Sequence, residues 1–224
     1  AIDIWFDADT PRVFTNLLWA SSSHSRTSVH PLSALTLTPP TWALHKLVGL
    51  PQVLAAQVVI VGSAAGMAGL YALTLRLMGI SFVVTACLSA LLIASAAFLH
   101  WSGTVELFAP GSFTIMIAIA ALAAGSRFGA IAWIAVSAMS LSVTVTNWMA
   151  GLAASLVRWR RLPFVGITLA ALVLVMTLSV IQRSAFNKAL LFFDPRGLMA
   201  ERAWTQPLME LREKEVAQWS LAHN

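Results

Sequence analysis

Residues 51–75 read PQVLAAQVVIVGSAAGMAGLYALTL, and this run contains no charged side chain. About 20 consecutive apolar residues allow an α-helix to cross the hydrocarbon core of a bilayer. The run is therefore long enough to span a membrane. It decides the fold class, because the sequence on either side of it has the same character.

Charged residues are rare throughout the chain. Of 224 residues, 58% are hydrophobic and 10% are charged, against about 25% charged in an ordinary soluble domain. Between Leu47 and Ile181 the charged residues are five arginines and one glutamate, namely Arg76, Arg127, Arg158, Arg160, Arg161 and Glu106. A soluble fold could not bury so much apolar surface. We therefore predict an all-α fold, a polytopic transmembrane helix bundle.

Four more hydrophobic runs follow the first one, and Gly, Pro or Arg residues lie between consecutive runs. They cover residues 81–100, 111–125, 128–157 and 162–182. The first and last of these four predict single spans, whereas 111–125 is short. Residues 128–157 are too long for one upright helix. We predict that this run spans to about Ser142, breaks at Thr144, Thr146 and Asn147, and returns as a second, shorter helix.

The arginines predict the orientation of these helices, because short cytoplasmic loops collect Lys and Arg. A hairpin in 128–157 places Arg76, Arg127 and the cluster starting at Arg158 on one side. Three regions follow: an exterior interfacial segment at 1–50, the bundle at 51–182, and an exterior membrane-proximal tail at 183–224 with a final helix from Pro207. We expect an integral protein of a bacterial inner membrane.

The exterior segment contains two predicted amphipathic interfacial helices. Thr10-Pro11 is a good helix start, with the hydroxyl as N-cap and proline at the first helical position. The apolar residues that follow, Val13, Phe14, Leu17 and Leu18, share one face, so residues 11–20 predict a short helix lying on the membrane. Thr38-Pro39 predicts the start of a second helix, which ends at Gly49.

Several functional classes are disfavoured by the sequence. The net charge is +5, but the cations punctuate apolar runs instead of forming a patch for nucleic acid. Cys87 is the single cysteine, which excludes an intrachain disulfide. Motifs for nucleotide phosphates, dinucleotides and zinc proteases do not occur.

The chain begins at Ala1 without an initiator Met, and we expect a fragment or processed product.

The candidate chemistry is concentrated in the first fifty residues. Asp7 and Asp9 precede Arg12, and His24, Arg26 and His30 follow. A carboxylate can accept a proton from an acceptor hydroxyl, while Arg and His can hold a phosphate leaving group through charge-assisted hydrogen bonds. Together these residue types suit transfer of a group from a lipid phosphate.

Each candidate also has a plainer interpretation. Asp7 and Asp9 precede a helix start, where the helix dipole favours acids regardless of function. His24 and Arg26 could belong to a solvated loop or contact lipid headgroups. Glu106 is a functional candidate as an acid near the hydrocarbon edge, or else it is exposed to water in its loop. Asn147 either lines a cavity or satisfies backbone groups freed by the helix break.

The pattern resembles the GT-C type of polytopic membrane glycosyltransferases, which use polyprenyl-phosphate sugars. The resemblance is carried by Phe6-Asp7-Ala8-Asp9, by residues 23–32 (SHSRTSVHPL), by Val105-Glu106-Leu107-Phe108 and by Thr146-Asn147-Trp148. It implies that Asp7 or Asp9 is the catalytic base or helps to bind the donor, and that Arg26 and His30 contact the donor phosphate. The family's first spanning helix is missing here, and the family usually has more spans than this chain.

Two functional hypotheses follow. In the first, the protein moves a sugar from a polyprenyl-phosphate carrier to a lipid, glycan or protein acceptor on the non-cytoplasmic face of the cell envelope. Catalysis is then assigned to Asp7 and Asp9, and substrate binding to Arg12, His24, Arg26, His30, Glu106 and Asn147. A divalent cation bridging the two aspartates to a phosphate is chemically feasible. In the second, the chain is a non-catalytic membrane subunit packing among partner membrane subunits in a larger complex.

Overall fold

A computed structural model describes residues 10–159, 162–195, 197 and 199 of the chain, and all helices and turns below belong to these residues. The regular structure of this part is entirely helical. The elements are α1 (Thr10–Leu18), η1 (Ser25–Ser28), α2 (Ser33–Lys46), α3 (Gln52–Leu77), α4 (Phe82–Ala94), α5 (Ala96–Gly103), α6 (Phe108–Ala123), η2 (Gly125–Arg127), α7 (Ala130–Val143), η3 (Val145–Asn147), α8 (Trp148–Arg158) and α9 (Leu162–Ala185).

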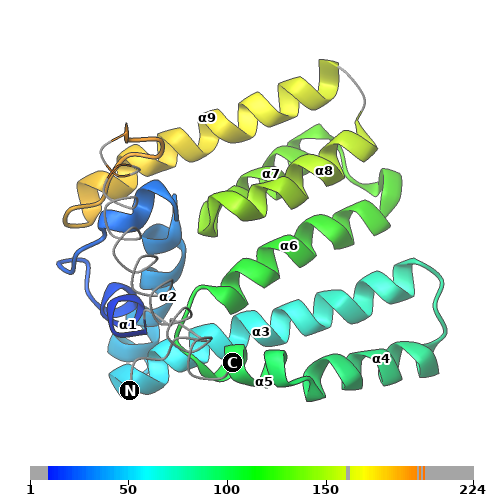
Figure 1. The fold of residues 1–224 in the computed structure, drawn as a ribbon, viewed down its shortest axis with the longest axis horizontal. Coiled ribbons are helices and arrows are strands. Elements are labelled where there is room, and N and C mark those ends of the chain that lie inside the picture. Colours follow the sequence, from blue (N-terminus) through cyan, green and yellow to red (C-terminus); the bar gives the residue numbers. More distant parts are fainter. Residues whose placement is uncertain (1–9, 160–161, 196, 198, 200–224) are drawn as a thin grey trace, which may run out of the picture.

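The longer helices lie side by side, and α1 and α2 lie across one end of them (Figure 1). Helix α6 packs against α3 on one side and against α7 and α8 on the other, and α9 packs on α7. Helices α3, α6 and α8 finish at the end remote from α1 and α2. The break between α7 and α8, the start of α6 and the end of α9 lie near α1 and α2.

Two helices, α3 and α9, are long and apolar enough to cross a membrane, and the bent pair α4 and α5 would be a third if it is one span. Helices α6 and α7 are apolar but shorter. These lengths and compositions, within the described residues, are consistent with an integral membrane protein. The final helix predicted from Pro207 lies outside the described residues.

The predicted division of residues 128–157 into two helices that pack together is confirmed. Helix α7 ends at Val143, one residue beyond the predicted Ser142, and α8 begins at Trp148 after the polar break. The two helices pack against each other. Residues 81–100, predicted as one span, do not form one continuous helix, because α4 and α5 meet at Ser95 with a bend of 60°. The Ser95 hydroxyl donates to Leu92 O and accepts from Phe98 N, so it satisfies backbone groups at the bend.

The predicted start of the second helix at Thr38-Pro39 is wrong. Helix α2 begins at Ser33 and carries Pro39 and Pro40 in its interior. Its N-cap residue, Leu32, has no side chain that can accept a hydrogen bond. Because the cap comes from another helix, as described below, no local signal marks this helix start.

Helix α1 begins at Thr10, close to the predicted start. Its apolar face is covered by the protein, since Val13 and Leu17 are buried among Leu37 of α2, Ala56 and Ile60 of α3 and Val105 before α6. A short helix at the predicted position is therefore confirmed. Its apolar face packs on α2 and α3, where the sequence predicts contact with the membrane surface.

Small side chains pack between several of the helices, while many large apolar side chains are exposed. On α3, a buried stripe of mostly small side chains recurs every four residues at Ala56, Ile60, Ala64 and Ala68. Large apolar side chains point outward instead, including Phe82, Ile131 and Leu162, which are 74%, 84% and 84% exposed. Small buried residues allow helices to approach closely in lipid.

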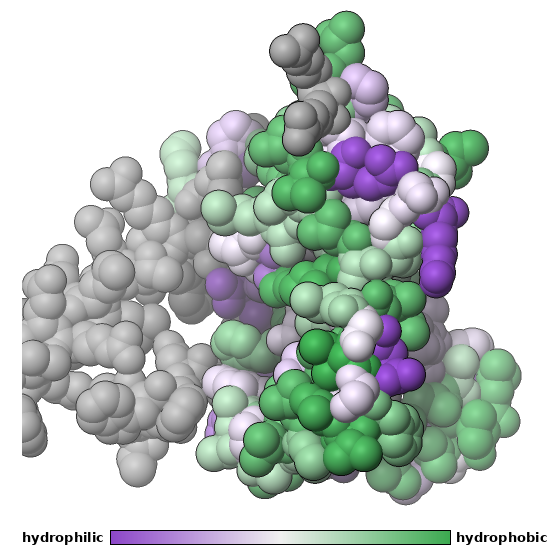
Figure 2. Space-filling view, turned by 90° about the vertical axis from the view of Figure 1, so that its right-hand side faces the viewer, coloured by the Kyte–Doolittle hydropathy of each residue, from purple (hydrophilic) through white to green (hydrophobic). Residues whose placement is uncertain are grey.

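One end of the molecule combines this apolar surface with isolated hydrophilic patches. Figure 2 views the end at which α3, α6 and α8 finish, and it shows such patches separated by hydrophobic surface. Arg76 lies in the last turn of α3, Arg127 follows α6 in η2, and Arg158 lies in the last turn of α8. The three arginines therefore share one end, as the hairpin topology predicts.

Candidate functional site

A cavity of about 420 Å³ opens at the opposite end of the molecule. Small-molecule sites have volumes of about 300–1,000 Å³, so this one has the size of a binding pocket. Four segments that are far apart in the sequence form it: α1, the turn from η1 to α2, the start of α6, and the break before α8. The lining residues are Arg12, Arg26, His30, Glu106, Leu107, Phe108, Gly111, Ser112, Ile115, Thr144, Thr146 and Asn147.

Five of the predicted site residues meet in this cavity, namely Arg12, Arg26, His30, Glu106 and Asn147. His24 does not line it. Asp7 and Asp9 lie outside the described residues. The cavity therefore brings three basic side chains, one carboxylic acid and one carboxamide to a single place, although up to 135 residues separate them in the sequence (Arg12 to Asn147).

His30 is held against the break between α7 and α8. Its Nδ1 atom lies 3.0 Å from Val143 O and 3.1 Å from Thr144 Oγ1. A carbonyl oxygen can only accept, so the contact with Val143 assigns a proton to Nδ1, and the charged ring, protonated at both nitrogens, can also donate from Nε2. Backbone hydrogen bonds on either side, Leu32 N to Ser142 O and Val145 N to Val29 O, fix the same segment.

Arg26 lies in η1, which is anchored to the chain that follows α9. The Thr27 hydroxyl donates to the backbone oxygen of Leu190 at 2.9 Å and accepts from its backbone N–H at 2.7 Å. The carbonyl of Arg26 accepts from Val29 N and His30 N. The turn that connects Arg26 to His30 is thus internally bonded and tied to the end of α9.

Glu106 lies immediately before Leu107, the N-cap residue of α6. An acid near a helix N-terminus is favoured by the helix dipole. Its side chain is 6% exposed, so the alternative that it is a water-exposed loop residue is wrong. Among the residues that the structure describes, no group of three or more His, Cys, Asp or Glu side chains could hold a metal ion.

Asn147 and Gly111 approach each other across the cavity wall. A Cβ atom added at Gly111 would lie 2.7 Å from Asn147 Nδ2, so the glycine makes room for the carboxamide. Gly111, Ser112 and Ile115 line the cavity but were not predicted as site residues. The Gly-Ser pair after Pro110, at the start of an otherwise apolar helix, is the signal that could have marked this wall.

His24 occupies a separate, buried position. It is 2% exposed, its Nε2 lies 3.1 Å from both Trp19 O and Ser22 Oγ, and its ring meets Phe186 edge-on at 5.0 Å. Burial lowers its pKa, the contact with Trp19 O opposes this, and the charge of Arg12 lowers it further. His24 is therefore held inside the protein as a packing and hydrogen-bonding residue of the amino-terminal segment.

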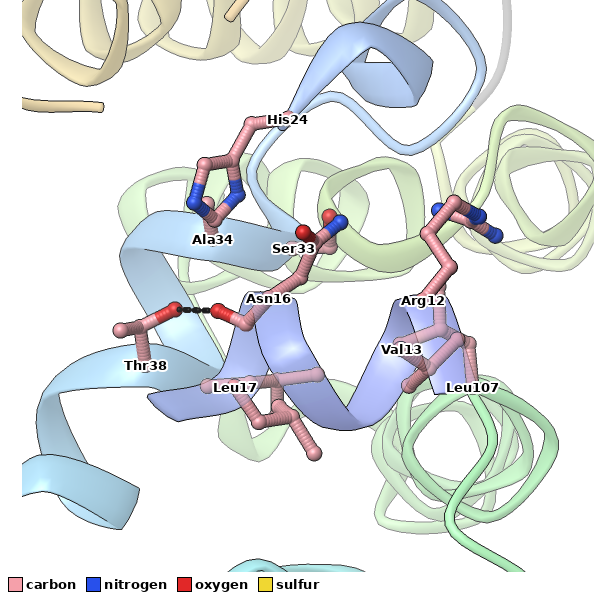
Figure 3. A pocket seen from close by; sticks show the side chains of 10 residues that line it. Arg12, Val13, Asn16, Leu17, His24, Ser33, Ala34, Thr38 and Leu107 are labelled. Atoms are coloured by element: carbon pink, nitrogen blue, oxygen red, sulfur yellow. Dashed lines mark hydrogen bonds between the residues drawn. The ribbon is translucent and has the colours of Figure 1, made fainter. Parts of the chain in front are cut away.

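His24 and Arg12 line a second cavity of about 20 Å³, which has room for about one water molecule. Figure 3 shows Arg12 at one side of this cavity and His24 at the other, with Asn16 between α1 and α2. The Thr38 hydroxyl donates to Asn16 O at 2.8 Å and joins the two helices there. Arg12 of α1 also lines the larger cavity, so its side chain contributes to the walls of both cavities.

No protein-family model matches the sequence, and no curated protein or solved structure shows significant similarity to it. The chemistry of the larger cavity must therefore be argued from its own residues. Arg and His donate charge-assisted hydrogen bonds to phosphate oxygens. Phe108 and Ile115 add apolar surface next to these polar groups. The arrangement suits an anionic group attached to an apolar molecule.

Proposed function

We propose that this chain is a membrane glycosyltransferase that moves a sugar from a polyprenyl-phosphate carrier to a lipid, glycan or protein acceptor. The observation that supports the proposal is the meeting of Arg12, Arg26, His30 and Glu106 in one cavity beside Phe108 and Ile115. A polyprenyl-phosphate sugar combines an anion, a polar sugar and an apolar chain. The cavity offers a matching surface to each of these parts.

The three basic side chains hold the donor phosphate in this proposal. They come from α1, from η1 and from the turn before α2, so the phosphate is approached from more than one element. Glu106 and Asn147, which line the same cavity, bind hydroxyl groups of the sugar or the acceptor in this proposal. The catalytic base is Asp7 or Asp9, and Asp9 precedes Arg12 by three positions in the sequence.

The reaction is a displacement at the anomeric carbon of the sugar. An acceptor hydroxyl oxygen forms a bond to that carbon, and its proton passes to the aspartate carboxylate. The bond between the anomeric carbon and the phosphate oxygen breaks, and the phosphate leaves with the electron pair. Arg12, Arg26 and His30 stabilise the charge on the polyprenyl phosphate that is released.

The proposed location is a bacterial inner membrane, with the cavity on the non-cytoplasmic side. Support comes from the arginines at the other end of the molecule, because Lys and Arg accumulate in short cytoplasmic loops. The cavity lies near the opposite ends of the same helices. The donor would therefore reach it from the outer leaflet.

The test uses the full chain in lipid nanodiscs with radiolabelled polyprenyl-phosphate sugars and a membrane extract as acceptor. We expect transfer of label by the wild type and a loss of about 100-fold or more when the essential aspartate is replaced, Asp7→Asn or Asp9→Asn. Arg26→Ala and His30→Ala should weaken binding of polyprenyl phosphate by about tenfold each, because each removes a charge-assisted hydrogen bond.

Arg76→Ala is the matched control, since it removes an exposed arginine from the remote end of α3. It should leave both binding and transfer unchanged. Undiminished transfer by both aspartate variants and by the double variant would refute the catalytic proposal. If the wild type neither binds polyprenyl phosphate nor transfers sugar, but copurifies in a defined complex of membrane proteins, the subunit hypothesis replaces it.

A further inference from the structure

A fully buried carboxamide lies behind the basic wall of the cavity. Gln182 is in the last turn of α9 and has no exposed surface (0%). Its Nε2 donates to Pro31 O at 2.7 Å, and its Oε1 accepts from Leu35 N at 2.9 Å. Burying an amide without hydrogen bonds is costly. Both ends of this one are bonded, and both partners belong to the segment that starts α2.

Gln182 performs the task of a missing helix cap. The first N–H groups of a helix have no partner within it, and an N-cap Ser, Thr, Asp or Asn usually accepts from the second or third helical residue. In α2 the N-cap position holds Leu32, and Leu35 is the third helical residue. The oxygen that accepts from Leu35 N comes instead from Gln182 on α9.

The other side of the same segment is bonded to α7. Leu32 N donates to Ser142 O at 2.7 Å, and the His30 ring contacts Val143 O at 3.0 Å. The turn that carries His30 is thus held between two helices. The end of α7 fixes one side of it, and the Gln182 side chain fixes the other.

We propose that Gln182 is a positioning residue that holds the His30 turn in place and thereby forms the basic wall of the cavity. Its role in binding a lipid phosphate rests on the function proposed above. Its effect on the placement of His30 does not depend on that function. The two claims can therefore be tested separately in one set of variants.

The test is NMR on protein labelled with ¹⁵N-histidine in nanodiscs, where the chain's five histidines give few ring signals. A His30→Gln variant assigns the His30 signal. Gln182→Leu removes both hydrogen bonds at similar side-chain volume. We expect the His30 ring signal to shift while those of His45 and His100 stay, and the affinity for polyprenyl phosphate to fall by about tenfold or more.

Ser179→Ala is the matched control, one turn earlier on the same buried stripe of α9. The Ser179 hydroxyl bonds only within its own helix, to Met176 O. This variant should change neither the His30 signal nor the affinity. A parallel variant, Gln182→Asn, keeps the amide but is one methylene too short to reach both partners, and it should shift the His30 signal in the same direction.

An unchanged His30 signal in folded Gln182→Leu or Gln182→Asn protein would overturn the proposal, and so would equal shifts of all five histidines. A His30 shift in a protein whose wild type does not bind polyprenyl phosphate would refute the proposed function alone. The positioning role would then stand.

Discussion

At the scale of single residues, the burial of His24 makes the stability of the amino-terminal segment depend on pH. Its ring contacts Trp19 O and Phe186, and its backbone N–H donates to Asn187 O after α9. Burial, the largest effect, lowers its pKa below the ordinary value of 6.5 because the charged ring loses its hydration. The unfolded chain therefore binds this proton more readily than the folded protein does.

We expect the stability that His24 contributes to be complete above pH 6.5 and to be lost as the pH falls towards and through the lowered pKa of the folded state. His24→Gln, which cannot take up a proton, should unfold at a temperature that depends less on pH. The measurement is thermal unfolding in nanodiscs between about pH 8 and about pH 5. Equal pH dependence of the two proteins would contradict the prediction.

The residues of the cavity were partly predictable because charged and amide side chains stand out in a lipid-compatible sequence. Arg12, Arg26, His30, Glu106 and Asn147 were all selected on that ground, and they line one cavity. Gln182 and Gly111 were not selected. Gln182 acts through a hydrogen bond to Leu35, and Gly111 acts by leaving room for Asn147. Both partners lie in other elements, so no local sequence pattern indicates these contacts.

At the scale of elements, the α7–α8 hairpin depends on close contact at Gly151. A Cβ atom there would collide with Ser140 Oγ and would lie 3.3 Å from Ser137 Cα, which is backbone and cannot turn away. We expect Gly151→Ala to lower the free energy of unfolding by about 1–3 kcal/mol through overpacking. Chemical unfolding in mixed micelles measures this change.

Gly166→Ala on α9 is the control, because nothing lies within 4 Å of a Cβ atom at that position. There the substitution should stabilise the helix by up to about 1 kcal/mol, since alanine restricts the unfolded chain more than glycine does. The prediction fails if both variants shift the unfolding transition in the same direction.

Most elements could be predicted because apolar length and polar breaks are local properties of the sequence. The hairpin break at Thr144 to Asn147 is the clearest case. The start of α2 could not be predicted, because its cap lies on α9. The bend at Ser95 was also missed, since the serine that stabilises it looks like any small residue in an apolar run.

At the scale of the whole molecule, the arrangement predicts which positions share a side of the membrane. A background variant, Cys87→Ser, first removes the exposed native thiol. Single cysteines at exposed Arg76 and Arg127 should then react with an impermeant maleimide in inside-out vesicles. Cysteines at exposed Ser23, between α1 and η1, and Gly103, the last residue of α5, should react in intact spheroplasts, because these segments lie at the end that contains the cavity.

Labelling of Gly103→Cys and Arg76→Cys from the same side would refute this topology and the site that depends on it.

The arginine pattern of the sequence was sufficient to predict that Arg76, Arg127 and Arg158 share one end of the molecule. It could not predict how α1 packs, since an apolar stripe alone does not tell whether lipid or protein will cover it.

The exposure of many large apolar side chains has a thermodynamic consequence. In a bilayer, large outward side chains such as Ile131 and Leu162 stay in hydrocarbon whether or not the helices are assembled. Separating α3 from α6 would then hydrate little apolar surface and give only a small heat-capacity change. Cohesion between these helices would come from dispersion forces at short range, and it would vary less steeply with temperature than packing driven by the release of water.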